Sequence, residues 1–379
     1  MRCKPIFVIL LISALPLATI ASDNNDLNAT ILYGLDTNPH QLSSGLSPVQ
    51  QHFAAAEVKL RSSFNRMFYF SAKANKSLYF DDARADRFKA YGSLAFKHKF
   101  KIFKKRFKYQ FSANYAKTDR TYVSKTTGLV ATFGGQSIAD RYDSEQKNYL
   151  AELSYRPYRT FKWDLSYQNR DKTYAEFNIA GLSNLDYTHK RYLFGMEYKA
   201  SDLGRFFFNG SFIQREYVDR RAKDLDGNSL AGTDLMYDYA AVDLGYIYRP
   251  DKKTRWKYTY YYATRTDNNS GYYDAVNGYL SITGKYQLGD YHFINGRLKY
   301  SKFSLENQLD PGDDSLLDED AKERQGGSAL IGYEWVLATL FKTNLALYIE
   351  LEHTVFANTN PLYTYERSKA SAGIRWSAF

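Results

Sequence analysis

The chain has 379 residues, enough for two or three soluble domains or for one large barrel. It carries 51 Lys and Arg against 41 Asp and Glu, and aromatic residues make up 17% of it, including 35 Tyr and 25 Phe. No stretch beyond the first 22 residues approaches the roughly eighteen apolar residues of a helical membrane span, which excludes that class. The basic residues are spread along the chain, which argues against a nucleic-acid partner.

The first 22 residues have the pattern of a secretory signal peptide. Two basic residues precede an apolar run over 6–20, and the small residues Ala21 and Ser22 follow it. We expect cleavage after Ala21 or Ser22, which leaves residues 23–379 as one domain. A retained anchor helix is the alternative, although the apolar run is short for a span.

Beyond the signal, the sequence predicts about sixteen strands, the first over 30–36 and the last over 366–379. The connectors between them are short and long in turn. The short connectors are 63–66, 101–106, 156–159, 201–205, 249–255, 288–290 and 338–342. The long connectors, rich in Gly, Asp, Asn or Ser, are 38–50, 79–86, 119–146, 173–189, 218–233, 266–276, 304–326 and 357–365. This alternation is typical of an all-β transmembrane antiparallel up-and-down barrel with short periplasmic turns and long extracellular loops; 14 to 18 strands fit the pattern.

The predicted strands have one aromatic face and one polar face. In WKYTYYYATRTD, the side chains of Trp256, Tyr258, Tyr260 and Tyr262 share one face, because successive strand side chains point to opposite sides. A soluble sandwich would bury this face, and a membrane barrel would turn it toward lipid. The regular alternation of connectors favours the barrel.

The opposite phase gives the predicted inner face, on which basic residues clearly outnumber acidic ones. A basic pore attracts anions and favours their passage. Alternatively, the bases pair with acids across the wall or neutralise lipid phosphates at the rims. Arg297 and Lys299 lie nearest the middle of the wall and should then contribute most. The predicted pore-lining residues are Lys108, Lys162, Arg170, Arg191, Arg215, Lys257, Arg265, Arg297 and Lys299.

The longest predicted loop, 119–146, has an apolar middle that carries glycines. An apolar segment is disfavoured in water, so we expect it to fold inward, with Gly128, Phe133, Gly134 and Gly135 at a constriction. By position it resembles the third loop of general porins. A hairpin that extends the barrel wall outward is the alternative.

The last strand, SKASAGIRWSAF, ends in Phe379. It resembles the carboxy-terminal strand of the Gram-negative outer-membrane β-barrel families, porins among them. The resemblance implies that Phe379 is part of the signal read by the barrel-assembly machinery, and that outer-membrane lipid and lipopolysaccharide surround the chain. The first strand, ILYGLDTNPHQL, more faintly resembles barrels that export exopolysaccharide or assemble surface lipoproteins. A periplasmic partner and a homo-oligomer are both compatible with these resemblances.

Catalytic patterns are poor in this sequence. The six histidines show no metal-ligand spacing, and the only cysteine, Cys3, leaves with the signal. We therefore expect no enzyme, no metal and no cofactor, although Glu352 and His353 could belong to a surface hydrolase. The sequence predicts an outer-membrane channel that passes small anionic or sugar-like solutes. The alternatives are an export barrel for a surface polymer with a periplasmic partner, and a surface enzyme or binding platform with a plugged lumen.

Overall fold

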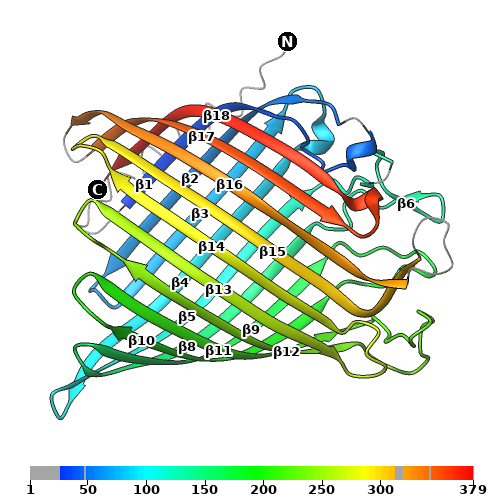
Figure 1. Ribbon diagram of the computed structural model, residues 1–379, viewed down its shortest axis with the longest axis horizontal. Coiled ribbons are helices and arrows are strands. Elements are labelled where there is room, and N and C mark those ends of the chain that lie inside the picture. The colour runs from blue at the N-terminus through cyan, green and yellow to red at the C-terminus, as the bar shows by residue number, and fades with distance from the viewer. Residues whose placement is uncertain (1–25, 47, 126, 312–318, 341–342, 379) are drawn as a thin grey trace.

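The computed structural model describes residues 26–378 except 47, 126, 312–318 and 341–342. Sixteen of its strands form one closed antiparallel barrel, in which β1 pairs with β18 (Figure 1). The expected fold class and strand number are confirmed. The barrel strands are β1 (Asp26–Asp36), β2 (Gln51–Phe64), β3 (Phe68–Tyr79), β4 (Arg87–Ile102), β5 (Lys105–Arg120), β8 (Ser144–Tyr158), β9 (Phe161–Tyr174), β10 (Tyr187–Lys199), β11 (Gly204–Tyr217), β12 (Met236–Tyr248), β13 (Thr254–Asp267), β14 (Ala275–Gln287), β15 (His292–Pro311), β16 (Glu319–Leu340), β17 (Thr343–Asn358) and β18 (Tyr365–Ala378).

The short connectors lie at one end of the barrel and the long ones at the other. We call these the short-turn end and the long-loop end. The β4–β5 connection is a two-residue turn in which Phe103 and Lys104 both have a left-handed backbone, with φ of 48° and 64°. Such turns follow the twist of the paired strands and keep the connection tight.

One predicted loop is wrong over most of its length. The segment 304–326 was expected to be irregular, but β15 continues to Pro311 and β16 begins at Glu319, with a register shift between Ser304 and Leu309. Two paired strands that project beyond the membrane need no apolar face. Their alternation therefore disappears while their backbone hydrogen bonds continue.

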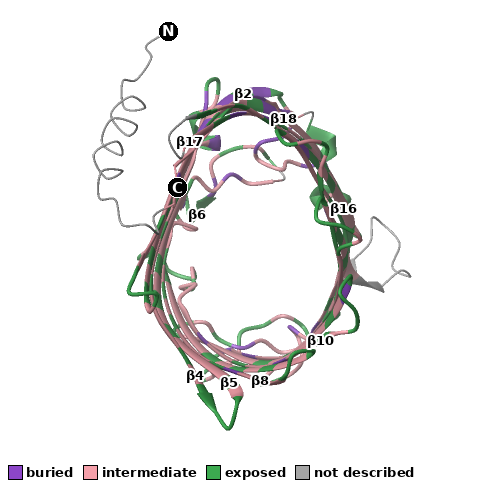
Figure 2. Cartoon of the chain, turned by 90° about the vertical axis from the view of Figure 1, so that its left-hand side faces the viewer, coloured by how far each residue is buried: buried purple, intermediate pink, exposed green. Residues whose placement is uncertain are grey.

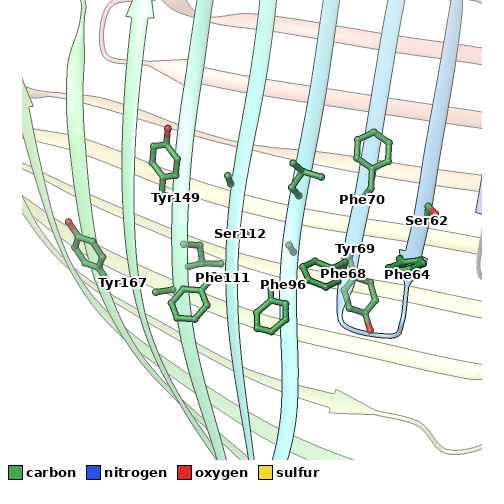
Figure 3. A pocket seen from close by; sticks show the side chains of 15 residues that line it. Ser62, Phe64, Phe68, Tyr69, Phe70, Phe96, Phe111, Ser112, Tyr149 and Tyr167 are labelled. Atoms are coloured by element: carbon green, nitrogen blue, oxygen red, sulfur yellow. The ribbon is translucent and has the colours of Figure 1, made fainter.

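The outer surface of the barrel is apolar and aromatic. Trp256, Tyr258, Tyr260 and Tyr262 expose between 40% and 44% of their area, and Tyr260 lies opposite Leu280 of the neighbouring strand. On another part of the wall, aromatic rings of neighbouring strands border a shallow depression of about 650 Å³ (Figure 3). A closed barrel with such a surface satisfies its backbone hydrogen bonds internally and presents side chains compatible with lipid.

The opposite set of side chains faces the interior. Some of these side chains contact each other from strands that are not neighbours, across the strand between them, as is usual on the concave side of a curved sheet. The Tyr79 hydroxyl on β3 donates to Asp36 on β1 across β2, and Arg375 on β18 pairs with Glu334 on β16 across β17. The barrel interior is therefore lined by charged and polar side chains.

Candidate pore lining

Three of the predicted pore-lining bases are paired with carboxylates. The distance from Lys108 Nζ to Glu152 Oε1 is 3.0 Å, and that from Lys162 Nζ to Asp164 is 2.7 Å. Arg297 Nη2 lies 3.2 Å from Glu352 Oε1, reaching across β16. Each pair has almost no net charge at a distance, so these three bases contribute little to the potential in the lumen.

A second group of predicted bases has no such partner. Arg170, His189 and Arg215 are directly opposite one another on β9, β10 and β11, and Arg191 follows His189 on the same face of β10. Among the described residues, the Nε atoms of the three arginines and Nδ1 of His189 are buried without a hydrogen-bond partner. No carboxylate of the described residues forms an ion pair with these arginines. We call Arg170, Arg191 and Arg215 the arginine cluster.

Aromatic rings support the unpaired bases. The Arg215 guanidinium lies 4.6 Å from the ring centre of Tyr187 and 5.3 Å from that of Tyr239. Arg265 lies 4.7 Å from the Tyr237 ring, and its Nε donates to the carbonyl of Tyr273. Cation–π contacts hold a guanidinium in place without cancelling its charge. The long-loop half of this wall therefore remains positive.

The two remaining predicted bases also lie over rings. Lys257 Nζ is 4.9 Å from the ring centre of Phe207, and Lys299 Nζ is 4.4 Å from that of Tyr279. No ion pair of either lysine is formed within the described part of the chain. Lys299 therefore keeps its charge near mid-wall, whereas Arg297 does not.

The described side chains leave part of the lumen open at the short-turn end. A cavity of about 820 Å³ opens there, with Lys285, Asn295, Glu334 and Arg375 among its lining residues. These residues belong to the inward-facing set of four different strands. The interior at this end is wide enough for water and small solutes.

The loop between β5 and β8 contains a hairpin of its own. Its strands β6 (Thr132–Phe133) and β7 (Gln136–Ser137) pair with each other in a separate sheet, and the turn places Gly134 and Gly135 at φ of 57° and 78°. A left-handed backbone at two successive positions favours glycine. The hairpin pairs with itself and does not continue a barrel strand.

Apolar residues of this loop are partly buried within it and under its neighbours. Val123, Ala131 and Ile138 are buried, whereas Phe133 remains 39% exposed. A methyl group added at Gly134 would come within 3.5 Å of Ile179 in the β9–β10 loop. The apolar middle predicted from the sequence thus has a local packing role.

Hydrogen bonds tie the same loop to three other loops. The Ser43 N–H donates to the Lys125 carbonyl at 3.1 Å, Arg84 Nη1 donates to the Gly128 carbonyl at 3.2 Å, and Arg141 Nη2 donates to the Ser183 carbonyl at 3.3 Å. Viewed along the barrel, β6 and other loop segments lie inside the ring of strands, beside β2 and β18 and beside β8 and β10 (Figure 2). The long-loop mouth is therefore partly covered from two sides.

The Arg84 side chain that binds this loop is itself fixed by a carboxylate. Its guanidinium donates to Asp82, and His40 Nε2 lies 3.0 Å from the same carboxylate. The Arg84 hydrogen bonds, with a contribution from His40, hold the pKa of Asp82 well below its usual range. The contact between the β3–β4 loop and Gly128 thus has a charged anchor.

The sequence did not reveal the polar network at the seam between β1 and β18. Asp36 is fully buried, and Arg367 holds its carboxylate through Nε at 2.9 Å and through Nη2. The Tyr79 hydroxyl donates to it at 2.9 Å and the Asn38 N–H at 3.2 Å. Asn38 also donates to the carbonyls of Leu42 and Glu366, which fixes the β1–β2 loop at this point. We call this set the seam network.

Glu352 and His353, the residues suggested for a surface hydrolase, lie on opposite faces of the barrel wall. Glu352 faces the interior and pairs with Arg297, whereas His353 lies on the outer face, where Nδ1 is 2.9 Å from Ser368 Oγ. The second histidine nitrogen lies 3.9 Å from Glu366, too far for a hydrogen bond, and the Ser368 N–H is already bound by Thr37. Glu352 and His353 therefore do not form one site.

Two expectations lie outside the described residues: the signal peptide over 1–22 and the terminal Phe379. Within the described part, no group of three or more His, Cys, Asp or Glu is placed to hold a metal ion. None of the described helices is both long and apolar enough to cross a membrane.

No protein-family model and no curated protein matches the sequence. Among solved structures, OmpT of Vibrio cholerae, an outer membrane protein, is 12% identical over 94% of this chain and 99% of its own, with a TM-score of 0.42. OccAB4 of Acinetobacter baumannii is 8% identical over 93% and 98%, with a TM-score of 0.46. A bacterial polysaccharide outer membrane secretin is 7% identical over 94% and 99%, with a TM-score of 0.44. These likenesses concern the fold alone. The closed sixteen-strand barrel of the structure is what confirms the expected all-β barrel fold.

Proposed function

We propose that the chain is an outer-membrane channel that passes small organic anions, with its long-loop end at the cell surface. The observation that carries the proposal is the arginine cluster. Its three positive charges face the interior without a carboxylate partner, on a wall whose other bases are partly neutralised. A charged wall of low dielectric raises the local concentration of counter-ions and lowers that of ions of its own sign.

The range of these charges sets where they act. Screening limits a charge to roughly 8–10 Å at ordinary salt, so the arginines act only on solutes that pass close to β9, β10 and β11. We propose that the loop between β5 and β8 narrows the path, with Gly128, Phe133, Gly134 and Gly135 at its edge. Its hydrogen bonds to three neighbouring loops support a fixed position at the mouth.

The reversal potential under a potassium chloride gradient tests the charge proposal in a planar bilayer. We expect the parent channel to be anion-selective, less so at high salt, and the variant Arg191→Gln with Arg215→Gln to lose much of that selectivity. The matched control is Arg297→Gln with Glu352→Gln, which removes one positive and one negative charge together. A cation-selective parent, or equal shifts in the two double variants, would overturn the proposal.

The same proposal includes export and assembly but no catalytic step. Residues 1–21 or 1–22 would be removed on export. Phe379 would serve recognition by the assembly machinery before the barrel enters membrane lipid and lipopolysaccharide. Mass spectrometry of the purified protein tests the first part, because the mature chain should begin at Ser22 or Asp23. An intact Met1 in protein extracted from the outer membrane would contradict it.

A further inference from the structure

Near the middle of the positive wall, the structure places one carboxylate that pairs with no base. Asp243 on β12 faces the interior and receives only a long hydrogen bond, 3.4 Å from Asn209 Nδ2 to Oδ2. Its Oδ1 is buried without a hydrogen-bond partner among the described residues, so Oδ2 is the oxygen that a solute could reach. Arg191 and Lys257 are near enough for their charges to act on it, but neither forms an ion pair with it. The carboxylate therefore keeps much of its capacity to accept hydrogen bonds.

An isolated carboxylate works against a wall that only attracts anions. It reduces the positive potential at mid-height and, by itself, repels every anionic solute that approaches. Leaving it under-satisfied in a partly buried position also costs free energy. A solute that donates a hydroxyl group to Asp243 Oδ2 would offset part of that cost, because the hydroxyl brings a donor proton to the charged group.

Beside this carboxylate stands a pair of stacked rings. Tyr261 on β13 is directly opposite Asp243, and Tyr279 on β14 is directly opposite Tyr261. The two ring centres are 4.9 Å apart with an interplanar angle of 16°, and Lys299 covers Tyr279 from the side of β15. Tyr279 therefore covers one face of the Tyr261 ring, and the other face is turned toward β12.

The inward side chains of β12 at this height are short. They are Ala241, Asp243 and Gly245, flanked by Tyr261 on one side and by Asn209 on the other. Gly195, opposite Asn209, has no side chain that could compete for the space: a methyl group there would approach Asn209 Oδ1 to 2.8 Å. The Phe207 ring fills the space over Gly245, but Tyr261, Asp243 and Asn209 are each partly exposed, so a solute in the lumen can reach them.

We infer that Arg191, Asn209, Asp243, Tyr261 and Tyr279 form a mid-wall subsite for sugar acids, that is, monosaccharides bearing a carboxylate. The inference rests on the proposed anion channel and names its solute class. The apolar face of the sugar ring lies on the Tyr261 ring, the hydroxyls donate to Asp243 and accept from Asn209, and the solute carboxylate binds Arg191. An aromatic face with a few converging polar groups is the usual composition of a small-molecule site.

Blocking of single-channel current by two matched acids tests this inference. Galacturonate carries a ring, hydroxyls and a carboxylate, whereas cyclohexanecarboxylate carries the ring and the carboxylate without hydroxyls. We expect galacturonate to interrupt the current of the parent channel for about tenfold longer, the effect of one hydrogen bond to a charged group. Equal residence times of the two acids in an anion-selective parent would overturn the subsite and leave the proposed function standing.

The variant Asp243→Asn separates recognition from simple electrostatics, because the two explanations predict opposite signs. Removing a negative charge should lengthen the residence of any acid if charge alone decides it. If Asp243 accepts hydroxyls, galacturonate residence should shorten while that of cyclohexanecarboxylate does not. The matched control, Glu350→Gln on β17, removes one inward carboxylate elsewhere and should leave the ratio of the two residence times unchanged.

A second variant examines the aromatic contact without changing charge. Tyr261→Leu should shorten galacturonate residence severalfold, and Tyr261→Phe should retain most of it, because stacking needs the ring rather than the hydroxyl. Longer galacturonate residence in Asp243→Asn, or parent-like residence in Tyr261→Leu, would overturn the subsite. A parent channel without anion selectivity would instead overturn the proposed function on which the subsite rests.

Discussion

Replacing Asp36 with alanine tests whether the seam network holds the first strand to the last. The carboxylate is fully buried, and the Arg367 side chain that binds it is only 16% exposed. Removing one member of a buried pair leaves the other charge without a partner, at a cost of about 3–5 kcal/mol in the free energy of unfolding. Tyr79 and Asn38 lose an acceptor in the same variant.

The barrel offers a matched exposed pair for comparison. Lys73 Nζ and Glu57 are 2.7 Å apart on β3 and β2, with side chains 45% and 36% exposed. Exposed ion pairs of this kind contribute below about 1 kcal/mol. Glu57→Gln should therefore lower the free energy of unfolding much less than Asp36→Ala does.

Equilibrium urea unfolding of the barrel reconstituted in lipid vesicles measures both effects, with tryptophan fluorescence as the signal. The double variant Asp36→Leu with Arg367→Met removes both charges and should recover much of the loss, since no unpaired charge remains. If the free energies of unfolding of Asp36→Ala and Glu57→Gln differ by less than about 1 kcal/mol, the value of an exposed pair, the seam does not depend on the Asp36 carboxylate.

The remaining predictions concern the loop and the wall. Deleting residues 128–135 should increase single-channel conductance while the protein still shows a heat-dependent shift in detergent gels; unchanged conductance in a folded variant would place the loop outside the path. Tyr260→Arg should destabilise the barrel by about 2–4 kcal/mol, because it puts a charge on the lipid face. Thr259→Arg, one residue earlier and facing the interior, should cost far less in the same urea assay, and equal costs would contradict the assigned faces.

The alternation of side chains within strands, together with that of short and long connectors, was sufficient to predict the fold and the strand number. It failed where strands leave the membrane, as in β15 and β16 beyond Ser304, because pairing outside lipid requires no apolar face. The pattern also predicted that β1 begins at Thr30, whereas it begins at Asp26, because the polar start of that strand carries no aromatic residue.

For the pore lining, the position of a residue in the alternating pattern predicts which face of the wall its side chain lies on. It does not predict which side chain it pairs with. Lys108 and Arg191 both fall on the inward phase, yet only Lys108 has a carboxylate beside it, and that pairing depends on the register between β5 and β8. Asp36 and Arg367 are 331 positions apart, so no local pattern connects them. The distinction between neutralised and free bases needed the three-dimensional arrangement.

The pairing of β1 with β18 also determines when the barrel can be completed. Closing a chain loop of this length costs about 5 kcal/mol of entropy, which the seam contacts recover only once the last strand has arrived. Until then, β1 and the most recently added strand each present an unpaired edge, and exposed strand edges template association with other chains. A chain built in this way has to be kept apart from its copies until β18 pairs with β1, because only that pairing removes both unpaired edges.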